Sequence, residues 1–194
     1  MVVADARSFS STEWSRAALH AIATGGVDSV TVEGLARTLG VTKGSFYWHF
    51  ADRTSLITEA LELWERAATT EVIDTLSEIA DPAARLRALF ETAFGAVGQG
   101  SVDSALIARL DDPVVGPVVR RVSARRLDFL QATYRELGLT RAAAAGRARI
   151  AYSTYVGHLQ VRHMLPDDRV LSKPSAAYRR QLMVTLMSGP PQST

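Results

Sequence analysis

The chain of 194 residues contains no cysteine. Disulfides and thiolate-ligated metal centres are therefore excluded, and a reducing compartment is the natural one. Long apolar runs are also missing, because charged or polar residues interrupt every window of about 18 residues, the length that a membrane span needs. The opening stretch MVVADARSFSSTEW lacks the basic and apolar regions of an export signal. We therefore expect a cytoplasmic protein with no membrane partner.

An excess of charge of one sign is missing as well. The chain has 22 Lys and Arg residues against 20 Asp and Glu residues, which gives a formal net charge of +2. Residues 1–60 hold five basic and six acidic side chains. Bulk charge therefore does not indicate nucleic acid, and any such partner would have to be held by a few placed contacts and helix N-termini.

No run of alternating β-branched residues bounded by turns is present, and helical periodicity dominates. The sequence predicts an all-α fold, and with 47% hydrophobic residues it can bury a proper core in one domain or two small ones. The capping-box spacing of Ser10 and Glu13, Asp52, and the pair Asp81-Pro82 are expected helix starts, with Ser172 or Lys173 ahead of the last helix. The predicted helices cover residues 10–25, 31–39, 42–49, 52 to beyond 72, 82–94, 102–110, a start near Pro113 or Pro117 up to 138, 140–164, and 174 onward.

The stretch TVEGLARTLGVTKGSFYWHF, from Thr31 to Phe50, combines two short apolar half-helices, a glycine and an aromatic cluster. A helix-turn-helix unit needs a small residue where its helices touch, a turn residue that tolerates positive φ, and an apolar inner face. Ala36 meets the first need and Gly40 the second. The inner face is supplied by Leu35, Leu39, Val41 and Phe46.

The third predicted helix carries hydroxyl, ammonium, indole and imidazole groups, which are groups that bind phosphate oxygens and base edges. One alternative is that the sequence FYWHF is only an aromatic plug of the core. Phe46 and Phe50 lie four residues apart and can fill the core together, which turns Tyr47 and Trp48 away from it. The spacing therefore favours a binding surface, since large exposed aromatic side chains are otherwise a liability.

Residues 31–57, TVEGLARTLGVTKGSFYWHFADRTSLI, resemble the DNA-binding signature of the TetR family of bacterial transcriptional regulators. The resemblance covers residues 10–60 well, and the rest of the chain matches in length and helical layout. It implies about nine helices, a homodimer, double-stranded operator DNA as a partner, and a small-molecule effector that releases a repressor from a palindromic operator. We expect a helix-turn-helix domain over residues 1–51 and an effector-binding and dimerisation domain, a helical bundle, over residues 52–194.

The resemblance also implies roles for single residues. Thr42, Lys43 and Ser45 fall where such proteins contact bases or phosphates, whereas Tyr47 and His49 fall where they hold the DNA backbone. Trp48 occupies a place often held by tyrosine or histidine, and Arg53 stands where lysine is more usual and would meet a phosphate. The implied DNA-binding set is Thr31, Thr42, Lys43, Ser45, Tyr47, Trp48, His49 and Arg53.

Apolar side chains cover more than half the circumference of the last predicted helix, in the run LMVTLM, residues 182–187. A second copy of the chain could cover this surface, which predicts a homodimer through the last two helices; a monomeric bundle with a large core is the alternative. Aromatic residues with a few polar groups between residues 86 and 165 suggest an effector pocket, although a residue of this kind taken singly is more often plain core or surface. The candidates are Phe90, Phe94, Leu106, Arg109, Tyr134, Tyr152, Tyr155, His158 and His163.

Signs of other functions are few. The four arginines at 120, 121, 125 and 126 are interpreted as a solvated face, against a second nucleic-acid patch. Nucleophile elbows, phosphate loops and His-Glu-x-x-His motifs are missing, so we expect no enzyme, no cofactor and no metal site. A protein that uses its helix-turn-helix for protein contacts stays open as a further alternative.

Overall fold

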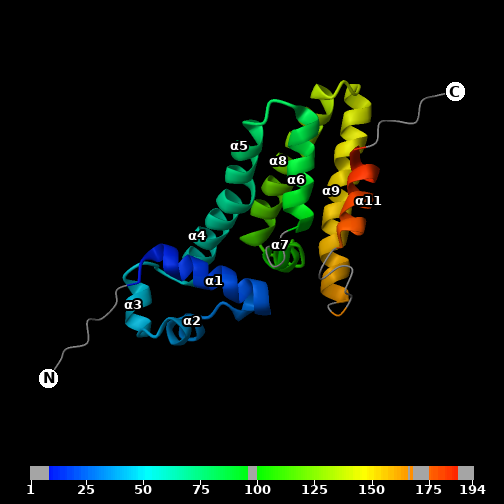
Figure 1. Ribbon diagram of the computed structural model, residues 1–194. Coiled ribbons are helices and arrows are strands. Elements are labelled where there is room, and N and C mark those ends of the chain that lie inside the picture. The colour runs from blue at the N-terminus through cyan, green and yellow to red at the C-terminus, as the bar shows by residue number, and fades with distance from the viewer. Residues whose placement is uncertain (1–8, 96–99, 166, 168–174, 188–194) are drawn as a thin grey trace.

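The computed structural model describes residues 9–95, 100–165, 167 and 175–187, and these residues form helices and connecting turns. Figure 1 shows helices α1 to α3 at one end and a helical bundle at the other, with α4 leading from one to the other. The expected all-α architecture is confirmed. No helix within these ranges is both long and apolar enough to cross a membrane.

The amino-terminal helices begin and end where local chemistry predicts. Helix α1, Ser11–Gly25, starts at a capping box in which Ser10 and Glu13 each bind the other's backbone N–H. Helix α2, Val32–Leu39, is capped by the Thr31 hydroxyl and ends at Gly40, whose φ of 71° is left-handed. Helix α3, Lys43–Tyr47, follows after this turn. The expected helix-turn-helix is therefore present.

The end of the chain's third helix differs from the prediction. Helix α3 stops at Tyr47 rather than near His49, and its N-cap residue Thr42 makes no side-chain capping hydrogen bond. The turn that follows leads to Asp52, which forms a capping box with Ser55 at the start of the next helix. The Thr42 hydroxyl is thus not used for capping.

Helix α4, Arg53–Glu65, continues through a π-helical segment, Arg66–Thr70, directly into α5, Glu71–Ser77. The three segments form one rod that runs from the amino-terminal helices along the bundle (Figure 1). The prediction that this helix runs past Val72 is confirmed, but its π-helical segment was not predicted. Counting this rod once, the described residues contain nine helices besides the short 3-10 turn Val27–Ser29.

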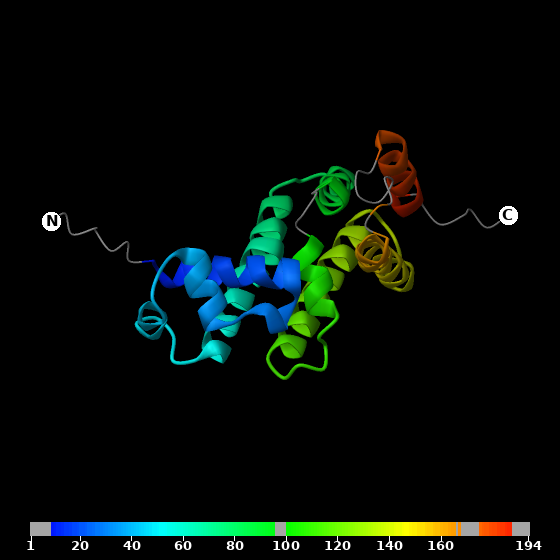
Figure 2. The ribbon, with the colours of Figure 1, turned by 90° about the horizontal axis from the view of Figure 1, so that it is seen from below.

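The bundle consists of α6, Pro82–Gly95; α7, Gly100–Ile107; α8, Val115–Glu136; α9, Arg141–Met164; and α11, Ala176–Met187. Helix α8 packs along α9, and α11 packs against α6 and α9. Seen from below in Figure 2, α9 and α11 lie on the side away from α1 to α3. The cap of α11 is Ser175, whose hydroxyl accepts the Tyr178 N–H, so the prediction of a start at Pro174 was early; residues 172–174 lie outside the described residues.

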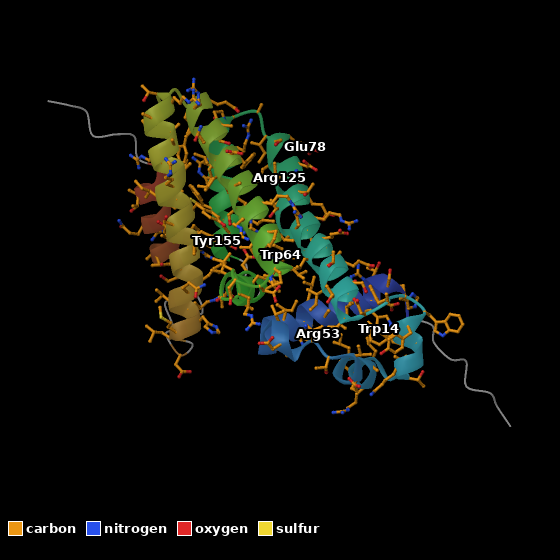
Figure 3. The ribbon with its side chains drawn as sticks, turned by 180° about the vertical axis from the view of Figure 1, so that it is seen from behind. Trp14, Arg53, Trp64, Glu78, Arg125 and Tyr155 are labelled. Carbon is orange, nitrogen blue, oxygen red and sulfur yellow. The ribbon has the colours of Figure 1, made fainter. Side chains whose placement is uncertain are left out.

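Two clusters of buried residues hold these elements together. The first joins α1 to α4 with α7 and the first half of α8, and its side chains include Trp14, Phe46, Trp64, Leu106 and Val119. The second joins α6, the second half of α8, α9 and α11. Figure 3 shows Trp14 among the amino-terminal helices and Trp64 further along the rod. The division at residue 51 stays a prediction, and the first cluster extends across it.

The turn at Gly40 provides a test of the helix-turn-helix geometry. We expect Gly40→Ala to lower the free energy of unfolding by about 1–2 kcal/mol, because a Cβ strains the left-handed conformation even where space is open. Gly146→Ala is the matched control, since Gly146 lies inside α9 with open space around it and should gain about 0.5–1 kcal/mol. Urea denaturation measures both changes, and equal effects of the two variants would contradict the assignment of the turn.

Candidate functional site

The inner side of α3 is fixed by aromatic packing. Phe46 is completely buried, with its ring 5.4 Å from that of Trp14 in an edge contact. Phe50 stacks on Phe46, with 5.4 Å between ring centroids. The i,i+4 pair therefore anchors this short helix from behind, as the spacing predicts.

The outer side of α3 and of the turn after it is exposed. Trp48 is 86% exposed and Tyr47 is 63% exposed. Thr42, Lys43 and His49 are also exposed, and Ser45 is half-buried. The structure thus brings six of the eight predicted DNA-binding residues together on one short stretch, while the exposed Thr31 lies at the start of α2.

Lys43 is not free on this surface. Its ammonium group forms an ion pair and hydrogen bond with Glu33 on α2, and both side chains are more than half exposed. The hydrogen bond from Lys43 holds the pKa of the Glu33 carboxyl below its ordinary value. A phosphate oxygen at this position would have to compete with Glu33 for the ammonium group.

Arg53 has a different environment from the one the resemblance implies. Its Nε donates to the Val30 carbonyl at 2.6 Å, and one terminal nitrogen donates to the Val27 carbonyl at 2.7 Å. The guanidinium therefore ties the start of α4 to the turn before α2. A phosphate contact by Arg53 stays a prediction, with two of its three nitrogens already donating to the backbone.

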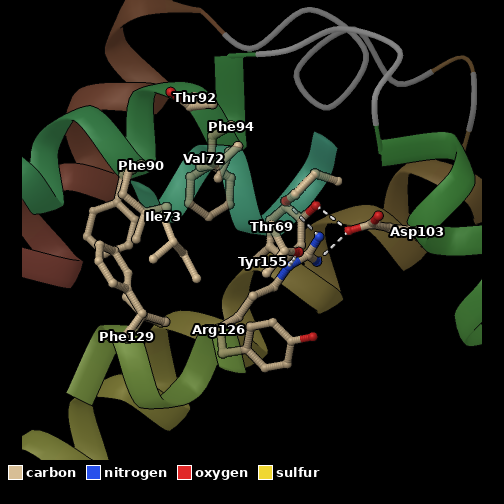
Figure 4. A pocket seen from close by; sticks show the side chains of 16 residues that line it. Thr69, Val72, Ile73, Phe90, Thr92, Phe94, Asp103, Arg126, Phe129 and Tyr155 are labelled. Carbon is tan, nitrogen blue, oxygen red and sulfur yellow. Dashed lines mark hydrogen bonds and ion pairs between the residues drawn. The ribbon is translucent and has the colours of Figure 1, made fainter. Parts of the chain in front are cut away.

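A cavity of about 120 Å³ opens in the bundle between the π-helical segment, α5, α6, α8 and α9. Four of the predicted pocket residues line it: Phe90, Phe94, Tyr152 and Tyr155. In Figure 4, Phe90, Ile73 and Phe129 lie on one side, whereas Arg126, Asp103, Thr69 and Tyr155 form a hydrogen-bonded group on the other. The cavity is therefore apolar at one end and polar at the other.

The other predicted pocket residues lie elsewhere. Leu106 is buried in the first core cluster, and Arg109 forms an ion pair with Asp28 at 3.0 Å. Tyr134 donates to the Leu186 carbonyl at 2.8 Å, and burial raises its pKa to about 12. His158 packs between Phe94 and Tyr178 behind the cavity wall, and His163 is exposed. None of these five residues lines the cavity.

The polar end is built around Arg126 and Asp103, which the sequence interpretation missed. Arg126 donates to Asp103 at 2.7 Å, to the Thr69 hydroxyl at 2.9 Å and to the Ala68 carbonyl at 3.1 Å. The assignment of Arg126 to a solvated face was therefore wrong. Arg120, Arg121 and Arg125 are exposed, as expected.

A signal for Arg126 was present in the sequence. Buried positions of α8 include Val119, Val122, Leu130 and Thr133. Position 126 continues this stripe at a spacing of four residues from Val122 and Leu130, so helical periodicity directs the side chain inward. A buried arginine requires a carboxylate partner, which would have drawn attention to Asp103.

The charge states at this polar end follow from the contacts. Burial is the largest single influence on Arg126 and opposes its charged form, but Asp103, together with Tyr155 and Tyr152, raises the pKa of the guanidinium above its ordinary value. Burial, together with the charge of Asp103, raises the pKa of the Tyr155 phenol. Arg126 therefore stays charged and Tyr155 stays a neutral donor, whose hydroxyl lies 2.7 Å from Asp103.

The π-helical segment is the part of the rod that contacts Arg126. In a π turn the backbone gains a residue relative to the α-helix, and such turns are frequent at functional sites. Here the Ala68 carbonyl and the Thr69 hydroxyl, both within the segment, accept hydrogen bonds from Arg126. The cavity is thereby linked to the rod that contains α4.

His158 makes the stability of the bundle depend on pH. Burial, with a smaller contribution from the charge of Arg162, lowers the pKa of His158 below 6.5. The unfolded chain then binds a proton at His158 more readily than the folded chain does. The contribution of neutral His158 to the free energy of unfolding is therefore complete above about pH 6.5, and it is lost as the pH falls toward the folded-state pKa. Thermal unfolding of the wild type and of His158→Gln should be measured between pH 7.5 and 5. The wild type should lose its advantage in melting temperature over the variant as the pH falls, and a difference in melting temperature that stays constant would contradict this.

No three His, Asp or Glu side chains within the described ranges are grouped so as to hold a metal ion. Residues 16–60 match the model of the family described as bacterial regulatory proteins, tetR family. Residues 16–60 therefore form a TetR-family amino-terminal segment. The matched residues include α2, the Gly40 turn and α3, which is the unit described above.

One curated relative matches a short part of the chain. The HTH-type transcriptional regulator AcrR of Shigella flexneri is 42% identical over 48 residues, which are 25% of this chain and 22% of the relative. The match thus spans about a fifth of that relative's length.

Solved structures match the fold over nearly the whole chain. A TetR-family regulator from Agrobacterium tumefaciens is 20% identical, with a TM-score of 0.73 over 91% of this chain and 98% of that chain. The regulator FadR of Bacillus subtilis, solved with stearoyl-CoA, is 16% identical, with a TM-score of 0.70 over 94% of this chain and 100% of that chain. A regulator from Saccharomonospora viridis, solved with choline, is 20% identical, with a TM-score of 0.71 over 91% and 92% of the two chains. At these identities the likeness shows the TetR fold, with its amino-terminal helix-turn-helix and carboxyl-terminal helical domain.

Proposed function

We propose that this protein is a cytoplasmic, non-enzymatic transcriptional regulator of the TetR family that binds double-stranded DNA as a homodimer and is released by a small molecule bound in the bundle. Repression of a palindromic operator is the proposed mode. The observation that carries the proposal is the outward face of α3, where Tyr47 and Trp48 are exposed above a buried Phe46. Aromatic, hydroxyl and cationic groups on so short a helix suit a major groove and its flanking phosphates.

Few contacts hold the DNA in this proposal. Lys43 would exchange Glu33 for a phosphate oxygen, and the exposed Tyr47 and His49 would contact the backbone. Thr42, whose hydroxyl makes no capping bond, is available for a base or phosphate. In a two-fold dimer the two α3 helices would enter successive major grooves, about 34–36 Å apart.

The proposed dimer surface lies on α9 and α11. Ile150 on α9 is 56% exposed and Val184 on α11 is 62% exposed, while Leu186 on the other side of α11 is buried. Pairing these two helices with their copies would form a four-helix bundle. A monomer is the alternative, and light scattering of the purified protein distinguishes the two.

Helix α7 provides a physical route from the cavity to the DNA-binding end. Asp103 on α7 belongs to the polar end of the cavity, while α7 also packs against α1. Just beyond α7, Arg109 binds Asp28 between α1 and α2. A ligand that shifts α7 or the π-helical rod would therefore change the placement of α3. If the ligand favours the shifted state, its binding would release the protein from DNA. Bound stearoyl-CoA and choline in the two relatives support a ligand-binding role for this domain.

Selection of bound sequences from random double-stranded DNA tests the proposal. We expect an enriched palindrome whose half-sites are centred about one helical turn apart. A protein that retains no DNA in this selection would favour the alternative in which the helix-turn-helix contacts another protein. Enriched sites without two-fold symmetry would contradict the dimer while leaving DNA binding in place.

A further inference from the structure

We infer that the cavity takes an uncharged, mainly apolar ligand of about the size of one substituted six-membered ring. This inference rests on the proposed function, because it assigns ligand chemistry to the same cavity. Three properties of the cavity carry it: its volume and apolar wall, the balance of its charges, and the saturation of the carboxylate among them.

The size and the wall favour a single apolar ring. A volume of about 120 Å³ is of the order of cavities lined by Leu, Ile and Phe that hold benzene. Most of the wall consists of aliphatic and aromatic side chains from α5, α6, α8 and α9. The apolar lining includes Val72, Ile73, Leu89, Phe90, Phe94, Phe129 and Leu130.

The charges on the wall cancel. Among the described residues that line the cavity, only Asp103 and Arg126 carry a charge. Their side chains are 4% and 16% exposed, and they pair at 2.7 Å. A charged ligand would therefore find no unpaired counter-charge, although burying a charge in such a site requires one.

Asp103 has little capacity left to bind a cation. Its Oδ1 accepts from the indole N–H of Trp64 at 2.7 Å, while its Oδ2 accepts from Arg126 and from the Tyr155 hydroxyl, each at 2.7 Å. A cationic ligand would meet this saturated carboxylate beside the positive guanidinium. The guanidinium also lies 5.6 Å from the Trp64 ring and 5.9 Å from the Tyr155 ring, which occupies those ring faces.

An anion meets the opposite difficulty. A carboxylate placed near Arg126 would also lie near Asp103, and two like charges in a poorly solvated site repel each other strongly. Displacing Asp103 would leave the Trp64 N–H and the Tyr155 O–H without their acceptor. A single neutral hydroxyl or carbonyl can instead hydrogen-bond at this end without disturbing the pair.

Three probes with one ring and different charges test the inference on the full-length protein. Isothermal titration calorimetry at pH 7.5 would compare benzyl alcohol, benzoate and benzyltrimethylammonium. We expect benzyl alcohol to bind at least about tenfold more tightly than either charged probe, since the charged probes lose hydration without gaining a counter-charge. Ala93→Phe, which fills the cavity from α6, should abolish this binding, whereas the matched change Ala142→Phe on the exposed surface of α9 should not.

A second variant tests the charge argument directly. Asp103→Asn keeps the shape of the side chain but leaves Arg126 as an unpaired positive charge on the wall. Benzoate should then gain at least about tenfold in affinity relative to benzyl alcohol. An unchanged ranking in this variant, confirmed as folded by circular dichroism, would overturn the role given to the ion pair.

The inference is also overturned if benzoate or benzyltrimethylammonium binds the wild type as tightly as benzyl alcohol, or if none of the probes binds at millimolar concentration. The DNA selection described above decides the proposed function separately. Retained operator DNA together with preferred binding of a charged probe would sink the inference alone. Loss of DNA binding with the expected probe ranking would sink the regulator and leave the ligand class of the cavity intact.

Discussion

Phe46→Ala is expected to lower the free energy of unfolding by about 3–5 kcal/mol. Phe46 is completely buried and contacts Trp14 at its edge and Phe50 by stacking, so its removal leaves a cavity at the centre of the first core cluster. Helix α3 has only five residues and no side-chain cap at its start, so this packing is what holds it in place. Urea denaturation followed by circular dichroism measures the loss.

Tyr47→Ala is the matched control for Phe46→Ala. It removes an adjacent aromatic side chain that is 63% exposed, and the free energy of unfolding should change by no more than about 0.5 kcal/mol. Comparable losses in the two variants would show that both sides of α3 are structural, and would count against an outward binding surface.

Asp103→Ala is expected to cost about 3–5 kcal/mol of unfolding free energy, because it leaves the guanidinium of Arg126 buried without its counter-charge. It also removes the acceptor of the Trp64 N–H and the Tyr155 O–H. The double variant Asp103→Ala with Arg126→Met should be more stable than Asp103→Ala, since no charge then remains unpaired.

The double-mutant cycle provides the control for this prediction. Arg126→Met alone leaves a buried carboxylate, which still accepts from Trp64 and Tyr155, so a loss smaller than that of Asp103→Ala is expected. If the effects of the two single changes simply add in the double variant, the pair is not energetically coupled and the polar end of the cavity is not organised as described.

The helices were predictable from the sequence because their start signals are local. Ser10, Asp52 and Asp81 each accept a hydrogen bond from a backbone N–H of the next turn of the chain. Helical periodicity likewise placed Phe46 and Phe50 inward and Tyr47 outward. The cap of α11 was missed because Ser172 and Ser175 are both favourable cap residues, and Pro174 between them suggested the earlier start.

The polar contacts were not predictable in the same way because they join residues far apart in the sequence. Arg126 and Asp103 lie 23 residues apart on different helices, and Arg53 reaches back to the carbonyls of Val27 and Val30. Composition indicates that an aromatic-lined pocket can exist, but packing decides which aromatic residues line it. Tyr152 and Tyr155 reach the cavity, whereas Tyr134, on the buried stripe of α8, points to α11 instead.

The central claim is that the exposed side of α3 binds duplex DNA. Fluorescence anisotropy with the selected DNA sequence, over a range of salt concentrations, tests it in Tyr47→Ala, Lys43→Ala and the control Arg87→Ala, which removes an exposed positive charge on α6. Tyr47→Ala should weaken binding by at least about tenfold, and Lys43→Ala should reduce the slope of log affinity against log salt by about 1. Arg87→Ala should match the wild type. Undiminished affinity and an unchanged salt slope in the two α3 variants would contradict the claim.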